Sequence, residues 1–119
     1  KKRLLISDDD DIIRMLLVDS LDYEGWVIEE AENGKIALDK LNLGSFDLVI
    51  IDCMMPYLTG MDVIGQLADD IKDSLIIIML TAKSQQTDKD LAMNAGANHF
   101  IQKPFSPAAL YELVDSLLK

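Results

Sequence analysis

Short apolar runs alternate five times with longer segments of helical periodicity, and this alternation constrains the fold more than any other feature of the chain. The apolar runs lie at residues 4–6, 26–28, 48–51, 75–80 and 100–101. The helix-periodic segments lie at residues 12–21, 34–43, 61–71, 87–95 and 107–118. Because each connection is long enough to hold a helix, we expect parallel strands with helices on both faces of the sheet. The pattern therefore predicts an α/β fold of the (βα)5 type.

The polar content of these runs predicts their order in the sheet. Residues 4–6, 48–51 and 75–80 are apolar throughout, as expected for strands that are buried on both faces. Residues 26–30 and 99–102 include Glu, His and Gln, which suits strands at the edges. With the second and fifth strands outside, we expect a flavodoxin-like three-layer sandwich, with a five-stranded parallel sheet in the order 2-1-3-4-5.

Residues typical of helix ends support these boundaries. Asn33 and Ser106 are helix-capping residues, and Ser106 is followed by Pro107 at the first helical position. Gly96 is expected to end the helix at 87–95 in a left-handed conformation. In the run that begins at Asp8, the last two acids, Asp10 and Asp11, are interpreted as a solvated turn that caps the first helix.

Acidic side chains outnumber basic ones by 21 to 11, which gives the 119-residue chain a formal net charge of −10. This balance argues against nucleic-acid binding, which depends on clustered Lys and Arg side chains. Hydrophobic residues make up 50% of the chain, enough for a packed core, so intrinsic disorder is not expected. At this length we expect one domain over residues 1–119.

Three features bear on where the protein works. The longest apolar run, at 75–80, is far shorter than the roughly 20 residues that cross a bilayer, and no signal peptide is visible. The single Cys53 excludes an internal disulfide, fits a reducing compartment and is interpreted as a packing residue. We therefore expect a cytoplasmic protein without membrane contact. The chain begins at Lys1 rather than Met, as expected for a piece cut from a longer protein.

Polar side chains stand at the carboxyl ends of the predicted strands, where parallel sheets form their ligand crevice. Asp8 and Asp9 follow the first strand, Asp52 ends the third, Thr81 ends the fourth and Lys103 follows the fifth. Three carboxylates, one hydroxyl and one ammonium are therefore expected to converge on one edge of the sheet.

Clustered carboxylates raise one another's pKa unless a cation lies between them, so a divalent metal is the natural complement of this cluster. The candidate ligands are hard oxygens, which favours Mg²⁺ over Zn²⁺. A carboxylate nucleophile beside Mg²⁺, a hydroxyl and a Lys is suited to forming an aspartyl-phosphate. The predicted chemistry is phosphoryl transfer.

Four motifs stand in a familiar order along the chain. They read LLISDDD at 4–10, DLVIIDCMMP at 47–56 with Gly60 following, IMLTAK at 78–83, and FIQKPF at 100–105 after Gly96-Ala97. With these motifs the chain resembles the receiver domain of two-component response regulators, of the chemotaxis-receiver type, over essentially its whole length.

The resemblance implies a role for each acidic residue. Asp52 matches the phosphoacceptor, which takes a phosphoryl group from the phosphohistidine of a sensor histidine kinase or a histidine phosphotransfer protein. Asp9 matches the direct Mg²⁺ ligand, and Asp8 the residue that acts mostly through a metal-bound water. The family's remaining protein ligand is a backbone carbonyl two residues past the acceptor, here that of Met54. Such a domain catalyses only its own phosphorylation and autodephosphorylation.

The resemblance also implies a switch. Thr81 would bind a phosphoryl oxygen, Lys103 would pair with the phosphoryl group, and the bond from Lys103 to Pro104 would be cis. Phe100 matches the aromatic that turns inward when the Thr moves. The output surface would be formed by residues 87–95, 99–102 and 107–118, and would act on a C-terminal output domain or a downstream protein.

Two other functions are open to this sequence. A Mg²⁺ phosphatase of the haloacid dehalogenase type also uses an Asp nucleophile, but it needs a second Asp where this chain has Met54, and it has a cap domain. A degenerate receiver that acts as a constitutive interaction module would lack the acceptor, the acidic pair or the Lys. This chain keeps Asp52, Asp8, Asp9 and Lys103, which favours the phosphoaccepting switch.

Overall fold

A computed structural model describes residues 1–22, 25–82, 90 and 93–119 of the chain. The strands are β1 (Lys2–Ser7), β2 (Trp26–Ala31), β3 (Leu48–Asp52), β4 (Ile76–Thr81) and β5 (His99–Gln102). They pair in parallel in one five-stranded sheet of order β2-β1-β3-β4-β5. The predicted strand order and both predicted edge strands are confirmed.

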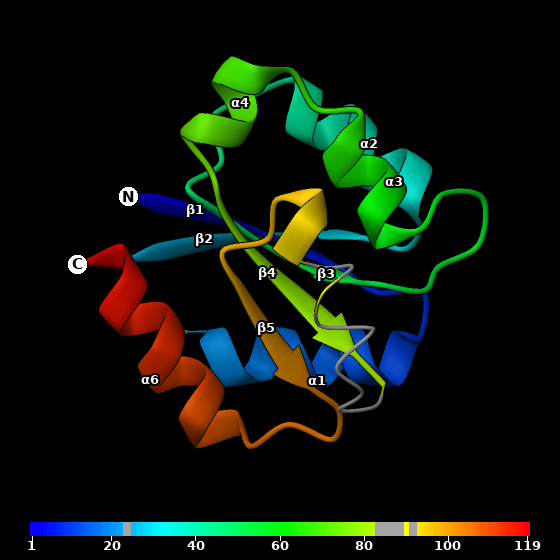
Figure 1. The fold of residues 1–119 in the computed structure, drawn as a ribbon. Coiled ribbons are helices and arrows are strands. Elements are labelled where there is room, and N and C mark those ends of the chain that lie inside the picture. The colour runs from blue at the N-terminus through cyan, green and yellow to red at the C-terminus, as the bar shows by residue number, and fades with distance from the viewer. Residues whose placement is uncertain (23–24, 83–89, 91–92) are drawn as a thin grey trace.

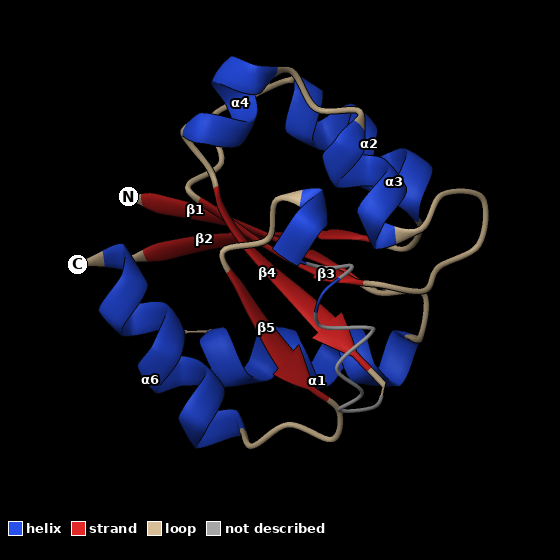
Figure 2. Cartoon of the chain, viewed as in Figure 1, coloured by secondary structure: helices blue, strands red, loops and turns tan. Residues whose placement is uncertain are grey.

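Helices cover both faces of the sheet (Figure 1). On one face lie α1 (Asp11–Leu21) and α6 (Pro107–Leu118), and on the other lie α2 (Gly34–Asn42), α3 (Gly60–Gly65) and α4 (Asp69–Asp73). Figure 2 shows the resulting three layers, with the strands between the two groups of helices. This is the predicted flavodoxin-like arrangement.

Alternate residues of the central strands point into two separate cores. Leu5, Val49 and Ile77 pack with the side chains of α2 and α3. Leu4 and Ile50, from the same strands, pack with the side chains of α1 and α6. Because neighbouring residues of a strand face opposite sides, the part of a strand that is covered on both sides is apolar at successive positions. The unbroken apolar runs in the sequence have this cause.

The segment predicted as one helix over 61–71 is two short helices, so that prediction was wrong. The first helix ends at Gly65, a residue with low helix propensity. Leu67 is buried among the core side chains, and Ala68 is extended, with φ −63° and ψ 148°. The chain bends there to bury Leu67, and it starts α4 at Asp69, where acidic side chains suit a helix N-terminus.

The predicted roles of Asn33, Ser106 and Gly96 at helix ends are confirmed. Asn33 Oδ1 accepts a hydrogen bond from the Ile36 amide at 2.9 Å, and Ser106 Oγ accepts one from the Ala109 amide at 3.3 Å. Gly96 has a positive φ of 115°. Of the predicted helix 87–95, Asp90 and residues 93–95 are helical, and the other positions lie outside the described residues. Within the described ranges no helix is long and apolar enough to cross a membrane.

Candidate functional site

Four of the predicted site residues meet at the carboxyl edge of the sheet. The carboxylates of Asp8, Asp9 and Asp52 each offer an oxygen, and these three atoms lie within 4.8 Å of one another. The Lys103 ammonium lies 2.9 Å from Asp8 Oδ2 and 3.2 Å from Asp52 Oδ2. The sheet order makes this possible because β1 and β3 are neighbours, and β5 follows β4 at the same edge.

Backbone amides fix the two buried carboxylates of this cluster. Asp8 is fully buried, and its Oδ1 accepts a hydrogen bond from the Asp10 amide at 2.9 Å. Asp52 is 6% exposed, and its Oδ1 accepts a hydrogen bond from the Met54 amide at 3.2 Å. Asp9, by contrast, is exposed at the rim. Solvent therefore reaches the cluster at Asp9, whereas Asp8 and Asp52 are buried.

The pKa of Asp52 lies above its ordinary value. Burial is the largest cause, because it disfavours the charged carboxylate, and the nearby charge of Asp8 acts in the same direction. The hydrogen bond from the Met54 amide and the ammonium of Lys103 lower the pKa but do not cancel the rise. The site without a metal thus disfavours a full negative charge on Asp52.

The pKa of Lys103 is also raised above its ordinary value. Burial by itself would lower this pKa, but the hydrogen bonds and the charges of Asp8 and Asp52 together outweigh burial. Lys103 is therefore a fixed positive charge at neutral pH. One ammonium faces three carboxylates, so the cluster keeps an excess of negative charge.

These residues fit a Mg²⁺ ion. All three carboxylates offer hard oxygens, and Mg²⁺ prefers carboxylates, water and phosphate oxygens. Opposite ligands of Mg²⁺ are about 4.2 Å apart, since each lies about 2.1 Å from the ion. The three carboxylate oxygens lie within 4.8 Å of one another, a spacing close to that value, so the residues present fit one ion.

The hydroxyl of Thr81 is an unusual feature of the same edge. Thr81 is 2% exposed, and within the described ranges its Oγ1 has no hydrogen-bond partner. The strand register pairs Asp52 with Leu80, so Thr81 stands one residue beyond the level of Asp52 on the neighbouring strand. A buried hydroxyl without a partner is costly unless a ligand supplies one. The hydroxyl is thus available to an oxygen-rich ligand.

The remaining predicted residues lie around this cluster. The Met54 side chain is 66% exposed, while its amide is bonded to Asp52. Phe100 is partly exposed on β5, and its register partner on β4 is Met79. The peptide bond from Lys103 to Pro104 is cis.

Three residues next to the cluster have the structural roles that the sequence predicts. Asp10 caps α1, because its Oδ1 accepts hydrogen bonds from the amides of Ile12 and Ile13 at 2.9 and 3.2 Å. Asp11 lies in the first turn of that helix and pairs with Arg14. Cys53 is a buried thiol that packs in the core.

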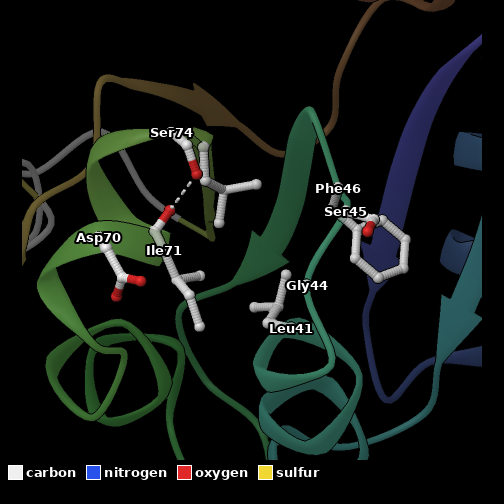
Figure 3. Close-up of a pocket in the computed structure, with 8 residues that line it drawn as sticks. Leu41, Gly44, Ser45, Phe46, Asp70, Ile71 and Ser74 are labelled. Carbon is white, nitrogen blue, oxygen red and sulfur yellow. Dashed lines mark hydrogen bonds between the residues drawn. The ribbon is translucent and has the colours of Figure 1, made fainter.

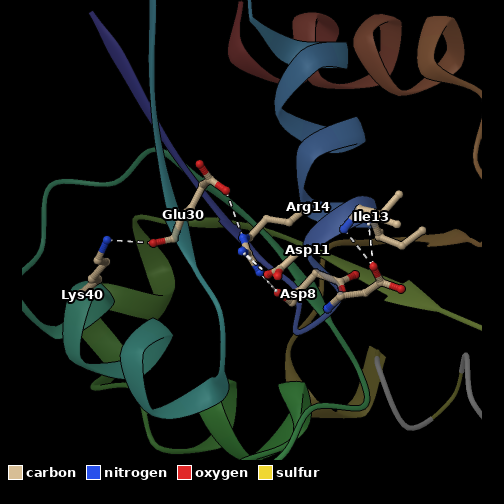
Figure 4. Close-up of polar contacts among 8 residues, drawn as sticks. Asp8, Asp11, Ile13, Arg14, Glu30 and Lys40 are labelled. Atoms are coloured by element: carbon tan, nitrogen blue, oxygen red, sulfur yellow. Dashed lines mark hydrogen bonds and ion pairs between the residues drawn. The ribbon is translucent and has the colours of Figure 1, made fainter.

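Arg14 is not among the predicted site residues. Its guanidinium donates to the carbonyl oxygen of Asp8 at 2.8 Å and to the carboxylates of Asp11 and Glu30 at 2.6 and 2.9 Å (Figure 4). The spacing of Asp11 and Arg14 on a helix could have indicated one of these contacts. The contact with the Asp8 carbonyl has no counterpart in the sequence pattern.

A pocket of about 160 Å³ lies between the end of α2 and α4 (Figure 3). Its lining includes Leu41, Phe46, Asp70 and Leu75. Phe46 and Leu75 precede β3 and β4, so the pocket lies at the amino ends of these strands, away from the carboxylate cluster. It contains none of the predicted site residues.

The chain is similar to proteins of one family. Residues 4–115 match the model of the response regulator receiver domain. The transcriptional regulatory protein ResD of Bacillus subtilis is 38% identical over 117 residues, which are 98% of this chain and 48% of ResD. The alkaline phosphatase synthesis transcriptional regulatory protein PhoP of the same organism is 36% identical over 118 residues, which are 99% of this chain and 49% of PhoP. The chain thus spans about half the length of these relatives.

Solved structures agree with the family match. The response regulator TrrA from Thermotoga maritima, in complex with Mg²⁺ and BeF, is 39% identical with a TM-score of 0.84, over 98% of this chain and 99% of TrrA. A CheY-like receiver domain protein from Methanospirillum hungatei is 30% identical with a TM-score of 0.88, over 98% of this chain and 93% of that one. The chain belongs to the response regulator receiver domain family, the phosphoaccepting domain of two-component signalling systems.

Proposed function

We propose that Asp52 is the phosphoacceptor, and that it takes a phosphoryl group from the phosphohistidine of a sensor histidine kinase or a histidine phosphotransfer protein. A carboxylate oxygen of Asp52 forms the bond to phosphorus, while the bond from phosphorus to the histidine nitrogen breaks. The observation that carries this proposal is the position of Asp52. It is buried at the carboxyl end of β3, 3.2 Å from the Lys103 ammonium and within the cluster of three carboxylates.

Other residues of the edge stabilise the transferred group. The Lys103 ammonium neutralises charge on a phosphoryl oxygen, and the Thr81 hydroxyl, which has no hydrogen-bond partner among the described residues, donates a hydrogen bond to another. When bound, Mg²⁺ supplies positive charge against the phosphoryl oxygens and lowers the pKa of the carboxylates. Asp9, Asp52 and the Met54 carbonyl would hold the ion directly, and Asp8 would hold it through a water molecule.

The phosphoryl group would act on a surface formed by residues 87–95, β5 and α6. Thr81 would move toward the phosphoryl group, and Phe100 would turn inward behind it. Phe100 is partly buried on β5 and pairs in register with Met79 of β4, two residues before Thr81, which supports this role. We further propose that residues 1–119 form one receiver domain that catalyses only its own phosphorylation and autodephosphorylation, in the cytoplasm.

The process that the switch controls is inferred from the relatives. ResD and PhoP are transcriptional regulatory proteins, and this chain matches about half of each. We infer that the surface acts on a C-terminal output domain or on a downstream protein. The net charge of −10 argues that this domain does not itself bind nucleic acid.

Phosphorylation by acetyl phosphate tests the assignment of Asp52. With MgCl₂, mass spectrometry should show the gain of one phosphoryl group, and hydroxylamine should remove it, as expected for an acyl phosphate. Asp52→Asn should abolish the gain, and EDTA should abolish it in the wild type. Asp47→Asn is the matched control, because Asp47 directly precedes β3, where its carboxylate accepts a hydrogen bond from the Arg3 amide. A phosphoryl group that persists in the Asp52 variant would overturn the assignment.

A further inference from the structure

Arg14 is held by hydrogen bonds to three separate segments of the chain. Its Nη1 donates to the Asp8 carbonyl at 2.8 Å, its Nε to Glu30 on β2 at 2.9 Å, and its Nη2 to Asp11 on α1 at 2.6 Å (Figure 4). The side chain is 14% exposed. A planar guanidinium can serve three acceptors at once in a fixed orientation, which a Lys ammonium on a flexible stem does less well. Arg14 therefore ties the end of β1 to α1 and β2.

The carbonyl that Arg14 binds belongs to the peptide group between Asp8 and Asp9. The Asp8 carboxylate has partners of its own in the Asp10 amide and the Lys103 ammonium. Within the described part of the chain, the Asp9 carboxylate has no hydrogen bond or ion pair. The direction of the Asp9 side chain therefore depends on its backbone, and the Arg14 guanidinium binds the carbonyl of the peptide group that joins Asp8 to Asp9.

We propose that Arg14 is a positioning residue for the cation site. By holding the peptide group between Asp8 and Asp9, it keeps the Asp9 carboxylate turned toward the oxygens of Asp8 and Asp52. This inference rests on the proposed Mg²⁺ site. Arg14 itself contacts neither the metal position nor the phosphoryl group, since its guanidinium is occupied by the Asp8 carbonyl, Asp11 and Glu30.

A positioning role and a purely electrostatic role of Arg14 predict opposite changes in Mg²⁺ affinity when its guanidinium is removed. Arg14 carries a positive charge at the backbone of Asp8, whose carboxylate belongs to the cluster that attracts a cation. If charge alone mattered, removal of this guanidinium would strengthen Mg²⁺ binding, because the site would become more negative. If orientation matters, the same change would weaken Mg²⁺ binding. The sign of the change in affinity therefore separates the two roles.

The test is a Mg²⁺ titration of the full chain without a phosphodonor, at constant ionic strength. NMR of the backbone amides monitors the binding. Arg14→Gln should raise the Mg²⁺ dissociation constant about tenfold, the range found when partners of metal ligands are removed. Arg14→Lys should raise it less, because one hydrogen bond to the Asp8 carbonyl is still within reach. At saturating Mg²⁺ the rate of phosphorylation by acetyl phosphate should recover in both variants.

Arg3→Gln is the matched control. Arg3 also pairs with a Glu of β2, Glu29, and lies near the start of β1, about 17 Å along the strand from Asp8. The control removes the same charge and should leave the Mg²⁺ dissociation constant unchanged. Unchanged or tighter Mg²⁺ binding by Arg14→Gln, or an equal loss in Arg3→Gln, would overturn the inference. No Mg²⁺ binding by the wild type would overturn the proposed metal site as well, so the two failures are distinguishable.

Discussion

The Lys103 ammonium lies 3.2 Å from Asp52 Oδ2, although the two residues are 51 positions apart in the chain. The same nitrogen lies 2.9 Å from Asp8 Oδ2, so one cation bridges two carboxylates that are almost entirely buried. This bridge raises the pKa of Lys103 against the opposing effect of burial, but it leaves the pKa of Asp52 raised by burial. The metal-free site is therefore short of positive charge, and its stability should depend on pH.

Without Mg²⁺, Asp52→Asn is expected to raise the thermal unfolding midpoint at pH 7. Because the pKa of Asp52 is higher in the folded protein than in the unfolded chain, the folded state binds the proton more tightly. The free energy of unfolding therefore falls as the pH rises from about 3.9, the ordinary value for Asp, through the raised folded value. Asn does not titrate. Thermal melts followed by circular dichroism should show a higher unfolding midpoint for Asp52→Asn than for the wild type at pH 7. This difference in midpoint should shrink toward pH 4, and a difference that is constant with pH would contradict this account.

Lys103→Met is expected to destabilise the metal-free protein by about 1–3 kcal/mol at pH 7, because two buried carboxylates lose their shared cation. The estimate is moderate because the Lys103 side chain is 21% exposed. The stabilisation by Lys103 is fully present below the ordinary Lys pKa, about 10.4, and is lost as the pH rises through the raised folded value. Urea denaturation measures the change. Lys119→Met, which breaks the exposed pair with Asp115, should have little effect, and an equal loss in both variants would refute the prediction.

Thr81→Val is expected to leave the stability of the metal-free protein unchanged or to raise it by about 1 kcal/mol. Val has nearly the shape of Thr, and it replaces a buried hydroxyl that has no hydrogen-bond partner among the described residues. The same variant should lose the response of the output surface to phosphorylation, which amide NMR of β5 can follow. A clear loss of stability would show that the hydroxyl has a protein or water partner in solution.

Gly60→Ala is expected to destabilise the fold and to slow phosphorylation of Asp52. A Cβ atom at this position would lie 2.4 Å from the backbone oxygen of Asp52, so the start of α3 or the end of β3 would have to move. Gly65→Ala is the matched control on the same helix, because apart from its chain neighbours and its own helix backbone no atom of the described residues lies within 4 Å of its Cβ position. The control should be neutral or stabilising by up to about 1 kcal/mol, since Ala favours a helix over Gly. Equal thermal midpoints and phosphorylation rates in the two variants would refute this reason for a Gly at 60.

The strands and their order could be predicted because they depend on local periodicity and on burial. The apolar run at 48–51 followed by Asp52 corresponds to β3, Leu48–Asp52, buried along its whole length. The polar residues of the second and fifth runs mark the edges of the sheet, as predicted. The prediction of one helix over 61–71 was wrong because tertiary packing overrides the local periodicity there. Its apolar spacing is helical, but the burial of Leu67 and the extended backbone at Ala68 divide it.

The sequence by itself determined the layer architecture, the strand order and the edge at which Asp8, Asp9, Asp52, Thr81 and Lys103 stand, because parallel strands end at a common edge. Only the tertiary structure decided which of their atoms touch. It put one ammonium between Asp8 and Asp52, left the Thr81 hydroxyl without a partner in the described part of the chain, and brought Arg14 to the Asp8 carbonyl. Such contacts depend on strand register and on helix packing, where a shift of one residue turns a side chain to the other face. No pattern along the chain encodes distances of that kind.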